Sequence, residues 1–149
     1  MTRATVKLKT ESGEEYVSLC LTIGKSEKFE LTGQVRQASG RIVLHDGTVC
    51  SPDAVQSAAF SGAIFALSLL RQNGKYPQCV INIEEVDGRL STGDLEKCAA
   101  ASLIAISYAT GSMDIMTKAE LDNWKIEEIH MSNDVANVGG GNIGIDEIG

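Results

Sequence analysis

The sequence has no long apolar segment. Among its 149 residues there is no run of about eighteen or more apolar side chains, although a helix that crosses a bilayer needs roughly that length. Residues 1–7 (MTRATVK) also lack the apolar core of a signal peptide. We therefore expect a soluble cytoplasmic protein that has no membrane partner.

Paired metal ligands are absent as well. The cysteines are Cys20, Cys50, Cys79 and Cys98. They are widely spaced and form no CxxC pair, so neither a zinc cluster nor a compact disulfide framework is indicated, and we expect buried free thiols. His45 and His130 have no neighbouring pattern of cysteines and acids that would name a role. We expect no metal site and no catalytic histidine.

The sequence contains no GxxxxGK[ST] motif, which excludes a phosphate-binding loop of that type. The Gly139-Gly140-Gly141 run does not follow a predicted strand, so it is poor evidence for dinucleotide binding. We expect no cofactor. We interpret residues 132–149 as a flexible, glycine-rich, acidic tail that follows a single domain at residues 1–131.

Positive charge is scarce in the last quarter of the chain. The whole sequence has 13 basic and 20 acidic residues, a net charge of −7. From Asp114 onward there are eight acidic and two basic residues, so this part alone contributes −6. The excess of acids disfavours unaided binding to a phosphate backbone.

The first thirty residues predict a β-hairpin. Apolar and polar side chains alternate over residues 4–8 and again over residues 17–23, which is the pattern of strands with one buried face. The polar segment 10–15 lies between them and contains Gly13, as expected for a turn. Further extended segments are predicted at residues 28–31 and 41–45.

Two helices are predicted. The first begins at Ser51 as N-cap and Pro52 at the first helical position, and it ends at Asn73-Gly74. Gly62 costs about 1 kcal/mol in a helix interior, so it indicates a close packing contact. The second follows a β-branched strand at residues 79–83 and spans residues 92–109, capped by Ser91 or Thr92. Residues 86–90 are predicted to form the loop before it.

Near the C-terminus, Thr117 is predicted to cap a short helix that ends near Trp124, and residues 125–131 are predicted to form the last strand. We expect Trp124 to cover the core. The predicted elements define one α+β domain. Its mainly antiparallel sheet of four to five strands is covered on one face by two long helices.

Four segments occur in the order and spacing of the fourth domain of translation elongation factor G. They are "SGEEYVSLCL", "SPDAVQSAAFSGAIFAL", "GKYPQCVINI" and "STGDLEKCAAASLIAI". The chain resembles this domain over residues 9–110, without the GTPase part of the factor. The resemblance implies a two-layer α/β sandwich with a left-handed βαβ crossover, which few proteins contain.

The resemblance also implies two loop tips that contact RNA in the ribosome. The first would contain Thr10, Glu11, Ser12, Gly13, Glu14 and Glu15, and the second Asp87, Gly88, Arg89 and Leu90. Three glutamates in the first tip depart from this role, because carboxylates repel phosphates. Lys7, Lys9 and Arg89 have the opposite charge. A plain connection between strand and helix is the alternative interpretation of the second tip.

Two function classes stay open. The first is a non-enzymatic module that binds a macromolecular partner or another copy of itself through the sheet or the tips. Ribosome or RNA contact is implied by the resemblance and disfavoured by the net charge.

The alternative is a small-molecule enzyme of the same fold that uses a cleft beside the helix starting at Ser51. The first turn of this helix has no glycine for a kinase phosphate loop. We expect Ser57, Ser61 and Ser68 to be buried or at the boundary of the core. Glu84, Glu85 and Asp87 offer an acid–base pair, but a solvated sheet end explains them more simply.

Overall fold

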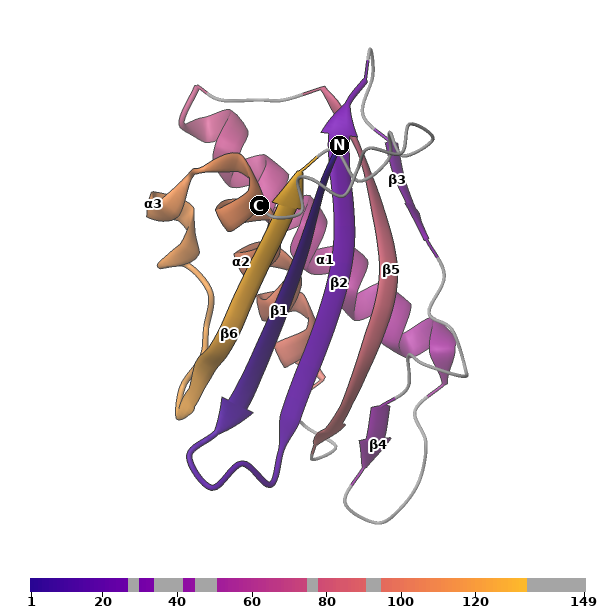
Figure 1. The fold of residues 1–149 in the computed structure, drawn as a ribbon, viewed down its shortest axis with the longest axis vertical. Helices are drawn as coiled ribbons and strands as arrows, with labels where there is room; N and C mark the ends of the chain where they lie inside the picture. Colours follow the sequence, from indigo (N-terminus) through magenta and orange to yellow (C-terminus); the bar gives the residue numbers. More distant parts are fainter. Residues whose placement is uncertain (27–29, 34–41, 45–50, 75–77, 91–94, 134–149) are drawn as a thin grey trace.

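The computed structural model describes residues 1–26, 30–33, 42–44, 51–74, 78–90 and 95–133. The elements in chain order are β1 (Thr2–Thr10), β2 (Tyr16–Lys25), β3 (Glu30–Gly33), β4 (Ile42–Leu44), α1 (Pro52–Gln72), β5 (Cys79–Leu90), α2 (Glu96–Thr110), α3 (Met113–Met116) and β6 (Trp124–Asn133) (Figure 1). Cys50, His45 and residues 91–94, where we expected the cap of the second helix, lie outside the described residues.

All of the described strands belong to one sheet. Its order is β3-β5-β2-β1-β6, and β4 pairs with β5 as well. The β1–β2, β1–β6 and β2–β5 pairs are antiparallel, whereas β3 and β4 both run parallel to β5. Because β3 and β4 pair with different parts of β5, they share one edge of the sheet. The mainly antiparallel sheet predicted from the sequence is confirmed.

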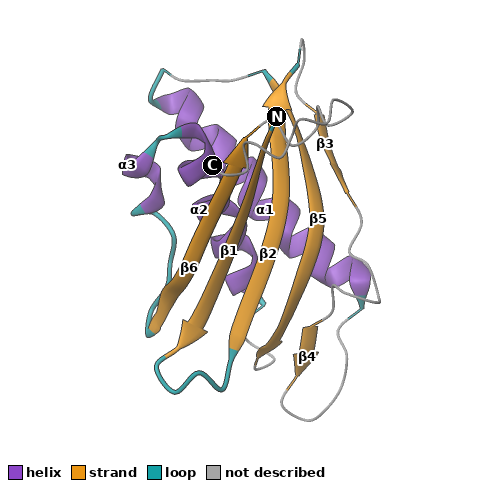
Figure 2. Ribbon diagram, in the orientation of Figure 1, coloured by secondary structure: helices purple, strands orange, loops and turns teal. Residues whose placement is uncertain are grey.

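Both long helices cover the same face of this sheet (Figure 2). The strands bury alternate side chains, such as Ala4, Val6 and Leu8 of β1, which are fully buried. Their neighbours in the strand are half-buried on the open face. The chain is therefore a two-layer α/β sandwich, because one face of the sheet is apolar and the other is polar.

The connection from β4 to β5 has unusual handedness. In Figure 1 both strands point downward, α1 runs upward behind the sheet, and β5 lies to the left of β4. A path that descends in front, rises behind and moves to the left forms a left-handed βαβ crossover. This handedness is found in only a small minority of parallel crossovers.

Helix α1 begins and ends where the sequence predicted. The Ser51 side chain accepts a hydrogen bond from the Ala54 amide, Pro52 occupies the first turn, and Asn73 is the C-cap. Gly74 follows with a φ of 76°. By length and composition alone, residues 53–72 could cross a membrane, with a mean hydropathy of 1.4. The fold instead packs one face of α1 against α2 and β5.

Gly62 permits the close contact between α1 and α2. A Cβ atom added at this position would overlap the backbone carbonyl of Ala99. One turn earlier, the Ala59 carbonyl accepts a hydrogen bond of 2.8 Å from the buried Ser102 hydroxyl. The packing role that the sequence indicated for Gly62 is therefore confirmed.

Several predicted boundaries were wrong. β5 continues from the predicted strand through residues 84–90, and no loop begins at residue 86. Thr117 is the C-cap of α3 and not an N-cap, because its hydroxyl donates back to the Asp114 carbonyl. Both predictions interpreted polar residues as signs of a loop or of a helix start. Polar residues fit equally well in a paired strand, as at residues 84–90, and in the turn that ends a helix, as at Thr117.

The last strand also extends beyond the predicted domain boundary. Ser132 and Asn133 pair with Arg3 and Thr2, so they belong to the sheet. Residues 134–149, the remainder of the predicted flexible tail, lie outside the described residues. Trp124 starts β6 and is 6% exposed, as expected for a residue that covers the core.

None of the cysteines that the structure describes forms a disulfide. Cys79 and Cys98 are buried and Cys20 is partly buried, whereas Cys50 lies outside the described residues. Burial raises the pKa of the Cys20 and Cys79 thiols. Both thiols are therefore protonated at neutral pH, which makes them poor nucleophiles.

A buried lysine joins α2 to the segment before β6. The Lys97 side chain is 1% exposed, and its Nζ lies 2.9 Å from Asp122 Oδ2 and 3.5 Å from Glu96 Oε2. The same Nζ is 6.0 Å from the centroid of the Trp124 ring. Asp122 has a φ of 53°, a conformation that Asp and Asn adopt more readily than most residues.

We expect Asp122→Asn to lower the free energy of unfolding by about 1–2 kcal/mol, because the buried Lys97 loses the nearer of its two carboxylate partners and keeps only Glu96. Asp122 is largely exposed, so solvent screening keeps the effect at the low end. Asn tolerates the same backbone conformation, which isolates the effect of charge. Urea denaturation provides the measurement.

The double variant Lys97→Met/Asp122→Asn is the control. It should be more stable than Asp122→Asn, because methionine fills the same space without an ammonium group to compensate. If both substitutions destabilised independently, the ion pair would have no role in this contact.

Candidate functional site

The alternative enzyme interpretation depends on a cleft beside Ser51. The positions of the serines at and within α1 bear on this interpretation. Ser51 caps the helix through its side chain, so its hydroxyl accepts from the Ala54 amide at 3.2 Å. Ser57, Ser61 and Ser68 are all exposed, whereas we expected buried or boundary positions. That expectation was wrong because the small residues of α1 divide into a buried alanine face and an exposed serine face.

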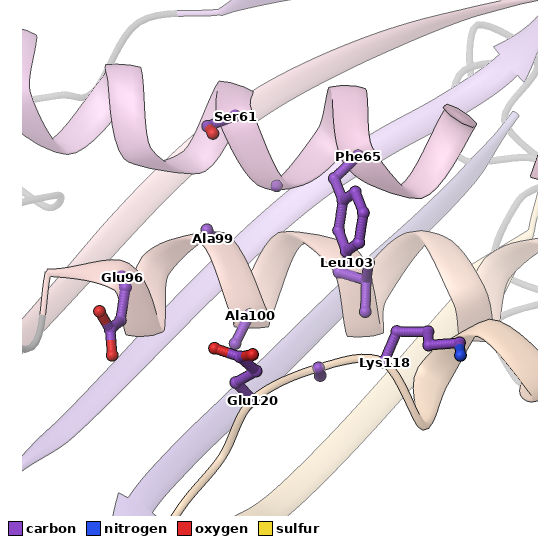
Figure 3. Close-up of a pocket in the computed structure, with 10 residues that line it drawn as sticks. Ser61, Phe65, Glu96, Ala99, Ala100, Leu103, Lys118 and Glu120 are labelled. Carbon is purple, nitrogen blue, oxygen red and sulfur yellow. The ribbon is translucent and has the colours of Figure 1, made fainter. Parts of the chain in front are cut away.

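A pocket of about 460 Å³ lies further along the helices, and we call it the helical groove (Figure 3). Its walls and floor come from α1, α2 and residues 118–120. The lining residues are Ser61, Gly62, Phe65, Glu96, Ala99, Ala100, Leu103, Lys118, Ala119 and Glu120. Ala99 and Ala100 of α2 have small side chains, which leave the space that forms the groove. Ser51 is not part of this groove.

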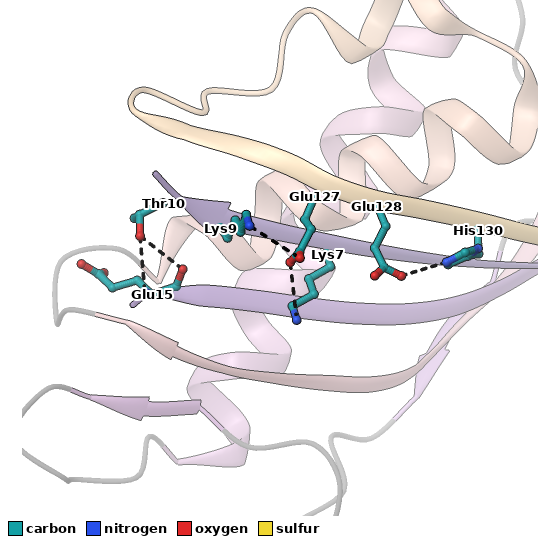
Figure 4. A network of polar contacts seen from close by, with 7 residues as sticks. All are labelled: Lys7, Lys9, Thr10, Glu15, Glu127, Glu128 and His130. Atoms are coloured by element: carbon teal, nitrogen blue, oxygen red, sulfur yellow. Dashed lines mark hydrogen bonds and ion pairs between the residues drawn. The ribbon is translucent and has the colours of Figure 1, made fainter. Parts of the chain in front are cut away.

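The turn between β1 and β2 lies at one end of the sheet, as predicted. Thr10 organises it: the Thr10 amide donates to the Glu15 carbonyl at 3.1 Å, and the Glu15 amide donates to the Thr10 hydroxyl at 3.3 Å (Figure 4). Gly13 supplies the positive φ of 79° that the turn requires. Glu11, Ser12 and Glu14 are exposed at its tip.

The second predicted tip is not a loop. Asp87, Gly88, Arg89 and Leu90 are the last residues of β5. Residues 87–89 pair with β2 on one side, and residues 88–90 pair with β4 on the other. Gly88 and Leu90 are buried toward the helices, while Asp87 is half-buried and Arg89 exposed on the open face. Only Asp87 and Arg89 therefore present side chains to a partner.

The two predicted tips still meet at the same end of the sheet. Arg89 is the register partner of Tyr16, the first residue of β2 after the turn. Arg89 is also exposed, which agrees with the position expected for a residue near the turn. Antiparallel pairing thus brings together segments more than seventy residues apart in the sequence.

Strand register creates a row of side chains across the open face at this end. Lys125 of β6 pairs with Lys9, Lys9 pairs with Tyr16, and Tyr16 pairs with Arg89. Register partners in a sheet project from the same face. We call Lys125, Lys9, Tyr16 and Arg89 the cationic row. It contains three positive charges around one aromatic ring.

Neighbouring side chains hold this surface in place. Glu127 lies 3.5 Å from Lys7 Nζ and 3.6 Å from Lys9 Nζ (Figure 4). Lys7 Nζ also lies 5.0 Å from the centroid of the Tyr16 ring, within the range of a cation–π contact. Glu127 is the extra residue at a register shift between β1 and β6, and it partly neutralises the row.

A second acid occupies the other register shift. Glu84, the extra residue between β2 and β5, accepts from the Arg3 guanidinium at 3.1 and 3.4 Å. This hydrogen bond raises the pKa of Arg3. The Cys20 thiol lies 3.5 Å from the same carboxylate. Glu84, which we weighed as an acid–base candidate, is therefore engaged in a structural ion pair.

No group of three His, Cys, Asp or Glu side chains suited to a metal ion occurs within the described ranges. His130 lies on β6 with its Nε2 2.8 Å from Glu128 Oε1, on the exposed surface. The other histidine, His45, lies in a segment that the structure does not describe.

Local sequence patterns did not identify Tyr16, Lys125 and Glu127 as part of this site. Tyr16 was visible as the first residue of a predicted strand, beside the turn. Lys125 and Glu127 lie more than a hundred residues away, and only the pairing of β6 with β1 brings them there. The register shift at Glu127 has no local sequence signal.

Comparison with protein-family models and with curated proteins finds no match for this sequence.

Proposed function

We propose that this protein is a cytoplasmic relative of the fourth domain of elongation factor G. It binds a macromolecular partner through one end of its sheet and catalyses no reaction. The four sequence segments that resemble the factor support this relationship. The two-layer sandwich and the left-handed crossover agree with the fold that the resemblance implies.

The cationic row beside the acidic turn is the observation that carries the proposal. Arg89 and Lys125 are exposed, and Lys9 and Tyr16 are half-buried between them. The sheet backbone fixes their spacing, so a partner meets residues that are already aligned and binding does not have to order the backbone. Arginine and tyrosine are also enriched where proteins contact large partners.

The charges of this surface limit the kind of partner. The row favours phosphate or carboxylate groups, whereas Glu11 and Glu14 on the neighbouring turn repel them. The net charge of −7 further weakens unaided binding to RNA. A ribosomal contact therefore requires that the row, and not the turn, faces the RNA.

Co-sedimentation with purified ribosomes at two salt concentrations tests this proposal. We expect binding at low salt that weakens as salt rises, because each phosphate contact releases counterions. Arg89→Ala should weaken this binding several-fold and reduce its salt dependence. Its free energy of unfolding should fall by at most about 0.5 kcal/mol, as is usual for exposed side chains.

Lys25→Ala is the matched control, since Lys25 is an exposed cation at the opposite end of β2. It removes the same charge and should leave co-sedimentation unchanged. Equal losses in both variants would show a general charge effect. Absence of co-sedimentation at low salt would remove the ribosomal role and leave a protein partner to be sought at the same surface.

A ligand-induced melting screen separates this proposal from the enzyme alternative. A small molecule that binds only the folded state stabilises it and so raises the melting temperature, increasingly as its concentration exceeds its dissociation constant. Strong protection by phosphate or a nucleotide would favour an enzyme. Partner binding without protection by any small molecule would favour the binding module.

A further inference from the structure

The helical groove has a half-exposed aromatic ring at its edge. Phe65 is 49% exposed and points from α1 across the groove toward Leu103 of α2 (Figure 3). Ile64, its neighbour in the sequence, is 55% exposed. Two adjacent large apolar side chains beside an apolar floor form a patch of the kind that marks an interaction surface.

The charges around this groove are arranged with opposite signs at its two ends. Figure 3 shows Glu96 at one end and Lys118 at the other, and the Glu120 carboxylate lies between them beside Ala100, on the side of Glu96. The first residues of α1 and α2 that line the groove, Ser61 and Glu96, lie toward the same end in this view. Outside the groove lining, Asp53 near the start of α1 extends the acidic end, and Arg71 near the end of α1 extends the basic end. One acid, Asp114, also lies at the basic end, where it accepts a hydrogen bond from the Asn73 side chain.

No charged side chain interrupts the exposed face of α1 between these two ends. The exposed residues in this interval are Ala54, Ser57, Ser61, Ile64, Phe65 and Ser68. Gly62 lies midway between Asp53 and Arg71 and contacts Ala99 beside the groove floor. The acidic end, with Glu120 on its inner side, is thus followed by the apolar side chains of Phe65 and Leu103 and then by the basic end.

We propose that the helical groove is the interface of a homodimer, occupied by the same groove region of a second copy. A two-fold axis through its centre brings the acidic end of each copy against the basic end of the other. Glu96 then faces Lys118 of the second copy, and the two Phe65 rings meet near the centre. Such an interface is self-complementary, as two-fold symmetry requires.

A second copy fits this surface because a two-fold rotation sets the acidic end of each copy toward the basic end of the other. A partner of uniform charge would be attracted to one end of the groove and repelled at the other. Arg71 has five N–H donors, so a contact across the interface adds to those within its own chain. This surface is on the helical side of the molecule, away from the open sheet face that contains the cationic row.

Sedimentation equilibrium over a wide range of protein concentration tests the dimer. The wild type should show a reversible monomer–dimer equilibrium. Phe65→Ser should raise the dimer dissociation constant about tenfold or more, because central aromatic residues dominate interface energies. Met131→Ser is its control: Met131 is an exposed apolar residue on the edge strand β6, outside the groove lining, and its loss should not change the equilibrium.

Charge reversal provides the sharper test. Glu96→Lys and Lys118→Glu should each weaken self-association, because each places like charges opposite one another. An equal mixture of the two variants should form heterodimers, since every contact in that pair again joins opposite charges. Lys25→Glu, on the sheet, matches Lys118→Glu in net charge and should dimerise like the wild type.

Thermal unfolding of each variant shows whether it is folded, so a loss of dimer is not confused with a loss of structure. A wild type that stays monomeric at every concentration would overturn the proposal, and the groove would then be open to a different partner. Dimerisation that persists equally in Phe65→Ser and Lys118→Glu would place the interface elsewhere. Neither result bears on the ribosome assay, which probes the sheet end.

Discussion

Gly62→Val is expected to lower the free energy of unfolding by at least about 3 kcal/mol, the upper range for overpacked sites. The new Cβ would overlap the Ala99 carbonyl, and a backbone group in a packed helix cannot rotate away as a side-chain tip can. Replacing glycine gains less than about 1 kcal/mol of helix propensity. The separation of α1 and α2 would have to increase.

Urea denaturation measures this effect as a lower midpoint with an unchanged slope. Ser57→Val is the matched control, because it introduces the same side chain on the exposed face of the same helix. Its effect should stay within about 0.5 kcal/mol. Equal midpoints for the two variants would mean that α1 and α2 do not approach one another at Gly62.

Leu90→Ala should lower the free energy of unfolding by about 2–4 kcal/mol, whereas Arg89→Ala should change it by at most about 0.5 kcal/mol. The difference follows from the strand geometry, since Leu90 is fully buried under the helices and its neighbour Arg89 faces the opposite side. Alanine at position 90 leaves a cavity at the end of the core.

This pair of variants also tests the end of β5 directly. In a surface loop, both residues would be exposed and both substitutions would have small effects. A comparable, small change for Leu90→Ala and Arg89→Ala in thermal unfolding would therefore contradict the strand through residues 84–90. Reduced partner binding in Arg89→Ala alone would agree with its place in the cationic row.

Much of the fold could be predicted from local patterns. The hairpin followed from the alternation of apolar side chains in β1 and β2, because a strand with one buried face has a period of two. Helix α1 followed from Ser51, Pro52 and Asn73-Gly74, since capping chemistry acts within a few residues. Both predictions depended only on interactions between near neighbours in the sequence.

The end of β5 was predicted incorrectly for a physical reason. Glu84, Glu85, Asp87 and Gly88 have low strand propensity, so the segment was interpreted as a loop. Residues 85–89 nevertheless pair with β2, and residues 88–90 also pair with β4, so backbone hydrogen bonding holds this segment in the sheet whatever its side chains. A central position in the sheet thus overrides local propensity.

The candidate site has two parts, the turn at residues 10–15 and the cationic row. The turn was predictable from the sequence, and the row was not. The turn at residues 10–15 was indicated by its polar residues and by Gly13. The cationic row required the register of four strands, and Lys125 joins it only through the pairing of β6 with β1. Charges that are scattered along the sequence acquire a common role when the sheet aligns them.

By itself, the sequence determined which segments form the hairpin and the first helix, and it indicated that Gly62 has a packing role, because turns, caps and side-chain periodicity are local properties. Only the tertiary structure decided that residues 84–90 extend a strand, that Glu84 and Glu127 neutralise cations on β1, and that Tyr16 lies between Lys9 and Arg89. These contacts join residues that are far apart in the sequence. They depend on strand register, which the packing of the whole sheet against its helices sets.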